Sequence, residues 1–492
     1  MQAVSLREGM FPVREAAPEQ LFKRNFVRKQ YHRDGFMDWM RDMLRHSFVL
    51  GNAYDSYVTT MKYMEGLIKE HKDRAPGTTS KLQTLVPSVG TFHTELHLVE
   101  AFHMYDSKYS ITARKHIPPT FHEIRHMLNL AQLLAVNVDL KLVSFDGDQT
   151  LYSDGGNFEE TSGLAYQIIE LLKAGIKVVL ITAANYQDQG PQYEVRLSGL
   201  LRRFAKSGLS AEEINRFHVM GGECHYLLRA EVVDEGEMPR LVGVDKEVWQ
   251  AAECEGPKPK DWDDVARDAF LDVAEKSFKK ARDDMKVRAR ILRKVTSVGM
   301  IPGGEKMAAA YPGGHGNAKI KQEVLNEVIQ RAIADIERIE TPIPFPYCAF
   351  NGGRDCWVDV GSKGVGVQVL QGYFGVTPEQ CMHVGDQFLE TGNDWACREA
   401  CTTIWIENPV ETFKILEHVL RFSLGADKSE RATARMKADA LAAEAEEKAN
   451  ASSPREAAAA GAGADTAPAS VFAAEDTKKE VMNVYTGEME AA

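Results

Sequence analysis

The chain has 492 residues, which is long enough for two or three domains with large buried cores. Its formal net charge of -12 argues against a nucleic-acid-binding protein, which normally presents a basic face. The 7 cysteines form no Cys-x-x-Cys pair, the first residues lack the apolar core of a signal peptide, and no uncharged stretch reaches membrane-spanning length. We therefore expect a soluble cytoplasmic protein with reduced thiols that binds neither nucleic acid nor membrane.

Residues 1–140 show the apolar spacing of amphipathic helices. The spacing predicts helices over Phe36–Val49 and Ser56–Lys69. A further helix is predicted after Thr120, which together with Glu123 has the pattern of a capping box.

A basic segment, Arg114-Lys115-His116, lies just before the predicted capping box. Solvated basic turns of this kind are common, but the segment can also hold an anion together with the N-terminus of the following helix. We keep both interpretations, with Lys115 as the residue that would contact a bound effector.

An apolar strand that ends in two carboxylates follows this region. The run Leu142–Phe145 predicts a buried parallel strand, and Asp146-Gly147-Asp148 opens a loop at its carboxyl end. Ligands bind at this end of the strands in open α/β sheets. The acidic loop is either a plain turn or a site at which a cation relieves the repulsion between the carboxylates.

These two carboxylates are suited to phosphoryl transfer in two steps. As a nucleophile, Asp146 would attack phosphorus and form an aspartyl-phosphate, while Asp148 would protonate the leaving alcohol and later deprotonate water. A hard divalent cation such as Mg²⁺ would hold the phosphate against Asp146 and neutralise its charge.

Three later segments supply the other groups that this chemistry needs. Thr182 ends a β-rich run, Lys363 lies in a Gly-Ser-Lys-Gly turn, and Asp386 is followed by a second acidic stretch, Thr391–Asp394. Alone, they could be a strand end, a surface charge and a turn residue. In this order, and after the Asp-x-Asp-x-Thr of the first loop, they resemble the four motifs of the haloacid dehalogenase superfamily of phosphatases.

The spacing of these motifs predicts a Rossmann-like α/β core with an inserted α+β cap of the C2 type and a helical N-terminal region. One helix fits between Asp146 and Thr182, whereas roughly 180 residues separate Thr182 from Lys363, far more than one crossover needs. The predicted regions are a helical regulatory or oligomerisation region (1–140), a catalytic core (141–188 and 346–423), a cap (189–345) and a low-complexity, largely disordered tail (424–492).

Within the cap, the patterns predict strands at Phe217–Met220 and Glu223–Val233 and helices over Asp264–Leu292 and Ala318–Ile339. In the tail, residues 426–450 predict a lone charged helix.

The stretch before Lys363 predicts a binding surface. If Asn351–Val360 is extended, Asp355, Trp357 and Asp359 lie on one face, because the side chains of a strand alternate. Two acids and an aromatic side chain on one face suit a pocket for a polar aromatic ring.

Up to about residue 423, the whole layout resembles the IMP-specific 5′-nucleotidases of fungi and related eukaryotes. The stretches that carry the likeness are KHIPPTFHEIRHMLNLAQ, FDGDQTLYSDGG, VVLITAANY, FNGGRDCWVDVGSKGVGV and VGDQFLETGNDWACR. The resemblance implies hydrolysis of IMP to inosine and phosphate in purine salvage, a homotetramer, and ATP as an allosteric activator that acts through the N-terminal region.

The resemblance also implies roles for particular residues. Asp146 would be the nucleophile and Asp148 the proton donor, with Mg²⁺ held by Asp146, the Asp148 carbonyl and Asp386. The substrate would contact Asp148, Asp154, Thr182, Asp355, Asp359 and Lys363. Because a carboxylate only accepts hydrogen bonds, an aspartate that faces the base would favour the protonated N1 of hypoxanthine over the bare N1 of adenine.

Two other functions remain open. A sugar-phosphate phosphatase or phosphomutase of the same superfamily would use the same aspartates but would need neither Trp357 nor the long N-terminal region. A nucleotide-sensing scaffold built on an inactive phosphatase fold would have lost at least one catalytic group, and none is lost here.

Overall fold

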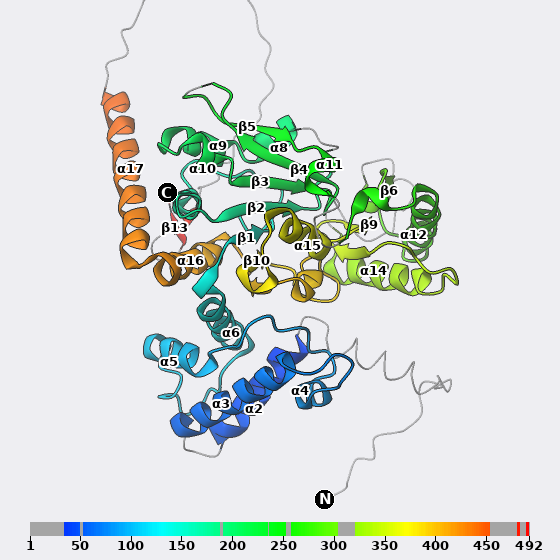
Figure 1. Ribbon diagram of the computed structural model, residues 1–492, viewed down its shortest axis with the longest axis horizontal. Coiled ribbons are helices and arrows are strands. Elements are labelled where there is room, and N and C mark those ends of the chain that lie inside the picture. The colour runs from blue at the N-terminus through cyan, green and yellow to red at the C-terminus, as the bar shows by residue number, and fades with distance from the viewer. Residues whose placement is uncertain are drawn as a thin grey trace, which may run out of the picture.

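The computed structural model describes residues 34–49, 53–186, 190–234, 236–251, 257–303, 320–452, 480–482 and 489–491. They form a helical N-terminal region, a central α/β core and a smaller α+β unit at the side of the core (Figure 1). Within these residues, no helix is both long and apolar enough to cross a membrane.

The N-terminal helices pack around a hydrophobic core of their own, in which Met40, Met61 and Phe102 are fully buried. The helices are α2 (Gly35–Val49), α3 (Ala53–Lys72), α4 (Lys81–Leu85), α5 (Leu98–Tyr109) and α6 (Phe121–Val136). The predicted capping box is present, because the Thr120 side chain accepts from the Glu123 backbone and the Glu123 side chain accepts from the Thr120 backbone. The helices predicted from the sequence are therefore confirmed as α2, α3 and α6.

The core is built on a 7-stranded sheet in the order β11-β10-β1-β2-β3-β4-β5. The strands are β1 (Leu142–Phe145), β2 (Lys177–Thr182), β3 (Phe217–Gly221), β4 (Tyr226–Glu231), β5 (Arg240–Gly243), β10 (Cys381–Gly385) and β11 (Thr402–Trp405). Strand β1 lies parallel between β10 and β2, so the three strands open at the same edge. All of its residues are buried, since Val143 and Phe145 pack on one face of the sheet and Leu142 on the other. The predicted Rossmann-like core is confirmed.

Helices cover both faces of this sheet (Figure 1). They are α7 (Gly163–Lys173), α8 (Gly190–Arg196), α9 (Ser198–Lys206), α10 (Ala211–Ile214), α11 (Lys246–Trp249), α15 (Lys363–Phe374) and α16 (Pro409–Val419). Short 3-10 segments lie at Asn137–Asp139, Pro259–Asp261, Pro378–Gln380 and Trp395–Glu399, and one π-helical turn lies at Leu420–Leu424.

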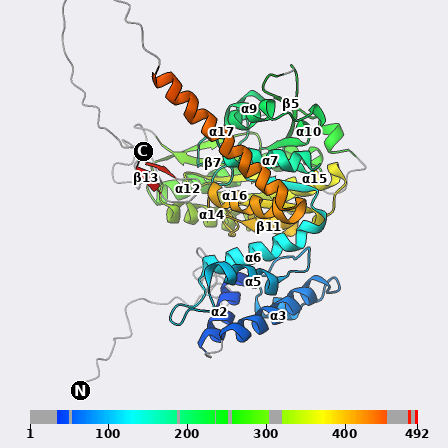
Figure 2. The same cartoon turned by 90° about the vertical axis from the view of Figure 1, so that its left-hand side faces the viewer.

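The tail begins with a long helix, α17 (Ala426–Ser452), that lies along the core instead of standing alone (Figure 2). Ala432 and Met436 are buried against the core, and the Asp439 carboxylate accepts from Tyr166 and Arg203. The prediction of a lone helix in a largely disordered tail is wrong here, because this helix has an apolar face that packs against α7. Farther on, β12 (Glu480–Met482) and β13 (Met489–Ala491) pair antiparallel, while residues 453–479 lie outside the described residues.

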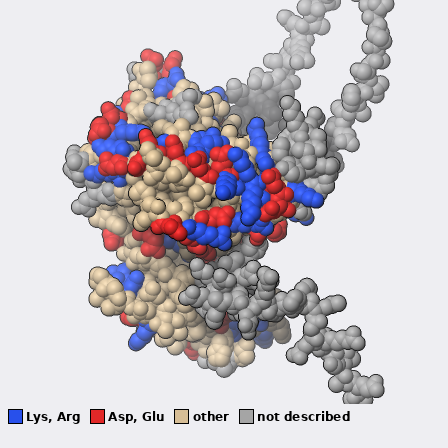
Figure 3. All heavy atoms as spheres, turned by 90° about the vertical axis from the view of Figure 1, so that its right-hand side faces the viewer, with Lys and Arg blue, Asp and Glu red and all other residues tan. Residues whose placement is uncertain are grey.

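The α+β unit, here called the cap, has a 4-stranded antiparallel sheet in the order β6-β7-β9-β8. Its elements are α12 (Asp264–Asp284), β6 (Ala289–Arg293), β7 (Ser297–Pro302), α14 (Gln322–Ile336), β8 (Tyr347–Asn351) and β9 (Cys356–Val360). The two helices pack on the sheet through a shared core. Basic and acidic side chains lie side by side on the face that carries the cap (Figure 3). On α12, Lys279 forms an ion pair with Glu275.

The boundary between core and cap differs from the predicted one. Strand β3 pairs parallel with β2, and β4 and β5 extend the same sheet, although residues 189–345 were expected to form the cap. Conversely, β8 and β9 belong to the cap sheet, although residues 346–423 were expected to lie in the core. A strand belongs to a sheet because it pairs with a neighbouring strand. The alternation of residues along one strand does not indicate which other strand it pairs with.

Two predicted elements also have different ends. The helix expected over Asp264–Leu292 stops at Asp284, and the chain turns at Lys286, with φ of 51°, into strand β6. The segment Asn351–Val360 is a hairpin turn followed by β9, because Gly353 has φ of 86° and reverses the chain.

Candidate active site

The four sequence motifs meet at the carboxyl edge of the core sheet. Asp146 follows β1 directly, Thr182 is the last residue of β2, and Asp386 follows β10. Lys363 is the first residue of α15, whose N-cap Ser362 accepts a hydrogen bond from the Val365 backbone. The strand order therefore brings together residues that lie more than two hundred positions apart in the sequence.

Lys363 is completely buried and holds a fixed position against two carboxylates. Its Nζ lies 2.6 Å from Oδ1 of Asp146 and 2.7 Å from Oδ1 of Asp394. Burial acts to lower the pKa of Lys363, but Asp146 and Asp394 raise it well above its usual value. The lysine is thus a permanent cation beside Asp146, which excludes the alternative of a surface charge.

Asp394 was part of the fourth motif, but the sequence indicated no role for it. Its Oδ1 accepts from Lys363 and, at 3.0 Å, pairs with Nε2 of His383, while its Oδ2 accepts from the Gln387 backbone at 2.9 Å. Burial acts to raise the pKa of Asp394, but Lys363 and His383 lower it below its usual value. In the sequence, only its place in the Gly-Asn-Asp of the fourth motif marks Asp394 as a candidate. Its contacts with Lys363 and His383 form only in the folded chain.

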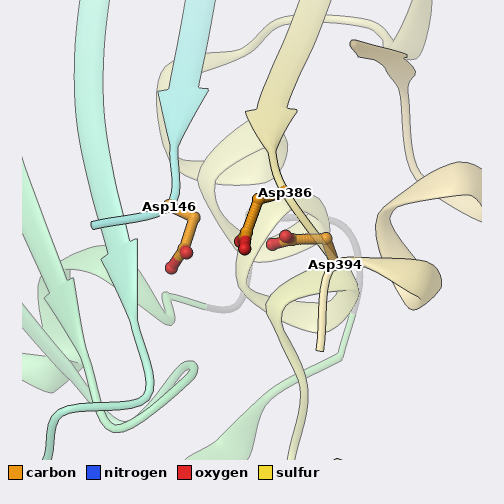
Figure 4. Close-up of side chains that lie close together, drawn as sticks. All are labelled: Asp146, Asp386 and Asp394. Carbon is orange, nitrogen blue, oxygen red and sulfur yellow. The ribbon is translucent and has the colours of Figure 1, made fainter. Parts of the chain in front are cut away.

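Asp146, Asp386 and Asp394 each offer a carboxylate oxygen within 4.8 Å of the others, and their side chains converge in Figure 4. Burial raises the pKa of Asp146 to about 7 and that of Asp386 well above its usual value. Asp386 Oδ1 is buried without a hydrogen-bond partner among the described residues. Oxygen donors of this kind fit a hard divalent cation. Asp394 already accepts at both of its oxygens, whereas Asp146 contacts Lys363 through Oδ1 and Asp386 Oδ1 has no partner among the described residues, so Asp146 and Asp386 have more capacity for a cation.

The loop after the first motif connects the core to the cap. Asp148 is half-buried, and its Oδ1 accepts from the Gly155 backbone at 2.7 Å and lies 3.6 Å from Nη1 of Arg196. Asp154 Oδ2 accepts from Nε of Arg354, in the β8–β9 turn of the cap, at 2.7 Å. At Gly147 a β-carbon would come within 2.4 Å of the Tyr152 hydroxyl, so any larger residue here would displace the Tyr152 side chain.

A cavity of about 700 Å³ lies between this edge and the cap, a size suited to a small organic ligand. Asp146, Asp148, Asp154, Thr182 and Asp386 line it from the core, and Lys294, Phe350, Asp355 and Trp357 line it from the cap. Burial raises the pKa of Asp355 to about 6, against the effect of a hydrogen bond from Trp357.

Of the residues predicted to contact the substrate, Asp359 and the fully buried Lys363 do not line the cavity. Asp359 lies on the cap strand β9. It is 5% exposed, and burial together with the Glu223 carboxyl raises its pKa well above its usual value. Its Oδ1 has no hydrogen-bond partner among the described residues. The predicted shared face therefore presents Asp355 and Trp357 to the cavity and leaves Asp359 behind it.

The predicted effector residue lies in the N-terminal region. Lys115 is exposed, while the adjacent Arg114 is paired with Glu123 at 2.5 Å. Glu123 is also the third residue of α6 and closes the capping box with the N-cap Thr120, so that helix end already holds a carboxylate. An anion beside Lys115 would therefore depend on side chains and not on the end of the helix.

An aspartate pair after β1, a hydroxyl at the end of β2, a buried lysine and a carboxylate after β10, facing an inserted cap, define a phosphatase of the haloacid dehalogenase superfamily. A model of the family described as IMP-specific 5′-nucleotidase matches residues 21–416. The chain belongs to this family of phosphoric monoester hydrolases.

Individual relatives agree. The chain is 38% identical over 345 residues to IMP-specific 5′-nucleotidase 1 of Plasmodium falciparum, which covers 70% of this chain and 74% of that protein. It is 35% identical over 421 residues to the protein of the same name from Yarrowia lipolytica, covering 80% and 95%.

Solved structures show the same likeness. An IMP-bound mutant of the P. falciparum IMP-nucleotidase superimposes with a TM-score of 0.71 at 34% identity, covering 81% of this chain and 99% of that one. An ATP-bound structure of the same enzyme gives a TM-score of 0.68 at 33% identity, covering 82% and 88%.

Proposed function

We propose that the protein hydrolyses IMP to inosine and phosphate, with Asp146 as the nucleophile and Mg²⁺ as the cofactor. The observation that carries this proposal is the contact of the buried Lys363 ammonium with Asp146, at the inner end of a cavity that is large enough for a nucleotide. A fixed cation at this position stabilises charge on the phosphoryl group as it is transferred.

In the first step, a carboxylate oxygen of Asp146 bonds to phosphorus while the bond from phosphorus to the 5′ oxygen of the nucleoside breaks. Lys363 stays beside Asp146 throughout and offsets the negative charge on the phosphoryl oxygens. The Thr182 hydroxyl accepts from the Ala184 backbone at 3.1 Å, which leaves its own proton free to donate to a phosphoryl oxygen. The product of this step is an aspartyl-phosphate on Asp146.

Asp148 moves the protons. Its Oδ1 is held by the Gly155 N–H, so the other oxygen can carry a proton toward the leaving 5′ oxygen. In the second step, the same oxygen takes a proton from water, the water oxygen bonds to phosphorus, and the bond to Asp146 breaks. Inosine, phosphate and a free Asp146 result.

Mg²⁺ would be held by Asp146, Asp386 and the Asp148 carbonyl. The crowding of buried carboxylates and the unpartnered Asp386 oxygen support such a site. When bound, the ion neutralises charge between the phosphate and the two aspartates. Asp394 is left to hold Lys363 in place.

Release of inorganic phosphate from a panel of IMP, GMP, AMP and sugar phosphates, with and without Mg²⁺, tests the proposal. We expect IMP to be hydrolysed far faster than AMP, and only with the metal. A preference for a sugar phosphate, or full activity in the presence of a chelator, would overturn the proposal.

We further propose that the enzyme is a cytoplasmic homotetramer that ATP activates through the N-terminal region, with Lys115 as a contact. The family resemblance and the ATP-bound P. falciparum structure support this part. ATP should lower the apparent KM for IMP, and Lys115→Ala should weaken that response at unchanged basal activity. The same ATP response in the variant would remove Lys115 from the effector site.

A further inference from the structure

The position of the phosphate determines where the base of a bound nucleotide must lie. Asp146, which contacts the buried Lys363, lines the core side of the cavity, and the other side is formed by the cap. The cap residues there include the aromatic side chains of Phe350 and Trp357, which are paired across β8 and β9. A nucleotide whose phosphate contacts Asp146 therefore extends its base toward this part of the cap.

Lys294 places an amine in this end of the cavity. It follows β6, in the turn to β7, and its backbone N–H donates to the Ser297 carbonyl at 2.8 Å, which fixes the turn. Its Nζ lies 4.5 Å from the centre of the Trp357 ring. That ring lies flat against β7, because a β-carbon on Gly299 would come within 2.5 Å of it.

The amine is directed to the cavity and not to an acidic partner. Within the described part of the chain, Lys294 forms no ion pair with a carboxylate, whereas the preceding Arg293 pairs with Asp272 on α12 at 3.2 Å. Lys294 and Asp355 line the same cavity. Burial lowers the pKa of Lys294, and the carboxylates of Asp359 and Asp355 act against that shift. Burial raises the pKa of Asp355 to about 6, and Lys294 is among the groups that act against it.

The hydrogen-bonding groups of Lys294 and Asp355 together match the N1 and C6 edge of a 6-oxopurine. A 6-oxopurine presents a C6 carbonyl, which accepts, beside an N1–H, which donates. An ammonium group only donates and a carboxylate only accepts, so the two side chains satisfy both positions. Adenine presents the reverse pattern, an amino group toward the lysine and a bare N1 toward the aspartate.

We propose that Lys294 recognises the C6 carbonyl of a 6-oxopurine nucleotide and acts with Asp355 to exclude 6-aminopurines. This inference rests on the proposed hydrolysis of IMP and names the residue that selects the base. It predicts no discrimination against GMP by Lys294, because guanine carries the same C6 carbonyl.

The test compares kcat/KM for IMP, GMP and AMP in the wild type, Lys294→Met, Lys294→Gln and a control, Lys279→Met. Lys279 is a second cap lysine, paired with Glu275 on the exposed face of α12 and absent from the cavity wall. We expect Lys294→Met to lower kcat/KM for IMP and GMP about tenfold or more, mainly through KM, and to leave AMP unchanged. Lys294→Gln should retain part of the IMP activity and raise AMP activity, because an amide both donates and accepts.

Binding to an inactive background separates recognition from turnover. IMP and AMP are titrated by calorimetry into Asp146→Asn and into Asp146→Asn with Lys294→Met. Lys294→Met should reduce the preference for IMP over AMP in binding. The melting temperature should stay unchanged. An unchanged ratio of IMP to AMP, or equal losses for both nucleotides, would overturn the role of Lys294. A wild type that hydrolyses no 6-oxopurine nucleotide would instead refute the proposed function itself.

Discussion

At the scale of single residues, the site is a line of buried polar contacts. It runs from Ser144 on β1 through His383 and Asp394 to Lys363 and Asp146. Removing one partner of a buried ion pair typically costs about 3–5 kcal/mol, because the other charge stays buried without compensation. Each member is therefore held in place by its neighbours, and the Lys363 ammonium cannot turn away from Asp146.

The first prediction at this scale concerns Asp146, the proposed nucleophile. Asp146→Asn replaces one oxygen by nitrogen, so the side chain keeps its shape while the amide loses the charge needed to attack phosphorus. We expect turnover of IMP to fall roughly 10⁴-fold or more, with a far-ultraviolet circular dichroism spectrum like that of the wild type. A variant that keeps near-normal turnover would show that another group attacks phosphorus.

Asp394 and Asp386 should respond differently to the same change. Asp394→Asn removes a charge that holds Lys363, so we expect kcat to fall about a hundredfold while KM for IMP and the Mg²⁺ concentration for half-maximal activity change little. Asp386→Asn removes a proposed metal ligand and should raise that Mg²⁺ concentration at least tenfold.

Titration of both variants with Mg²⁺ distinguishes a metal ligand from a residue that holds Lys363. The readouts are activity and the shift in melting temperature that the metal causes. If Asp394→Asn raises the metal requirement as much as Asp386→Asn does, then Asp394 is a ligand. Its hydrogen bonds to Lys363, His383 and Gln387 would then have to rearrange when the metal binds.

At the scale of elements, helix α6 connects the N-terminal region to the active-site edge of the sheet. Nη1 of Arg125 and Nδ2 of Asn129 donate to the backbone carbonyl of Trp405, the last residue of β11. The Trp405 indole N–H in turn donates to the Asp386 carbonyl at 2.9 Å. Trp405 therefore connects α6 to the backbone of Asp386, a proposed metal ligand.

Glu411 makes this connection dependent on pH. Burial acts to raise its pKa, but hydrogen bonds from His126 and Arg125 lower it well below its usual value of 4.5. A lowered pKa in the folded state means that the stabilisation is fully present above pH 4.5 and is lost as the pH falls further. We expect Glu411→Gln to lower the free energy of unfolding by roughly 1–3 kcal/mol at pH 7 and by progressively less below pH 4.5.

Urea unfolding of both proteins from pH 7 to pH 3 measures this difference. Glu407→Gln is the matched control, because Glu407 is more exposed and lies 3.3 Å from Arg125. Its effect should be smaller at every pH. A constant difference between the wild type and Glu411→Gln down to pH 3 would contradict the assignment to this carboxylate.

Elements with local signals were predicted well, and elements defined by distant partners were not. The capping box at Thr120 and the apolar run of β1 depend on neighbouring residues, so both were visible in the sequence. The membership of β3 and β8 in the two sheets depends on pairing across long stretches of chain, which no single strand specifies. The Gly352-Gly353 pair is a local signal for a hairpin turn. The alternation of Asp355, Trp357 and Asp359 instead favoured one continuous strand.

The same distinction holds for the site. Asp146, Thr182, Lys363 and Asp386 stand in recognisable motifs, and the strand order brings them together. The contacts of Asp394 and the position of Lys294 over Trp357 arise from segments that meet only in the folded chain. The sequence does not identify a functional residue that lies outside any motif until the residues it contacts are known.

At the scale of the whole molecule, α17 lies across the core (Figure 2) and contacts two of its helices, α7 and α9. Its Asp439 carboxylate accepts from Tyr166 on α7 at 2.8 Å and from Arg203 on α9 at 2.6 Å, and the Arg203 guanidinium lies 4.7 Å from the Tyr166 ring centre. The helix lies beyond residue 416, where the family match ends, and away from the cavity wall. Its contribution should therefore concern stability and not catalysis.

Deletion of residues 426–492 tests this separation. The deletion exposes the surface that Ala432 and Met436 cover and leaves Arg203 without its carboxylate, so we expect a loss of about 2–3 kcal/mol of unfolding free energy. Asp439→Asn should lose about 1 kcal/mol, and Glu430→Gln, on the exposed face of the same helix, should lose almost nothing. Because none of the described residues in this stretch lines the cavity, kcat and KM for IMP at 25 °C should stay within twofold of the wild type in all three proteins. A truncated enzyme of unchanged melting temperature would show that α17 does not hold the core helices together, and one that is stable but inactive would place the tail in the catalytic cycle.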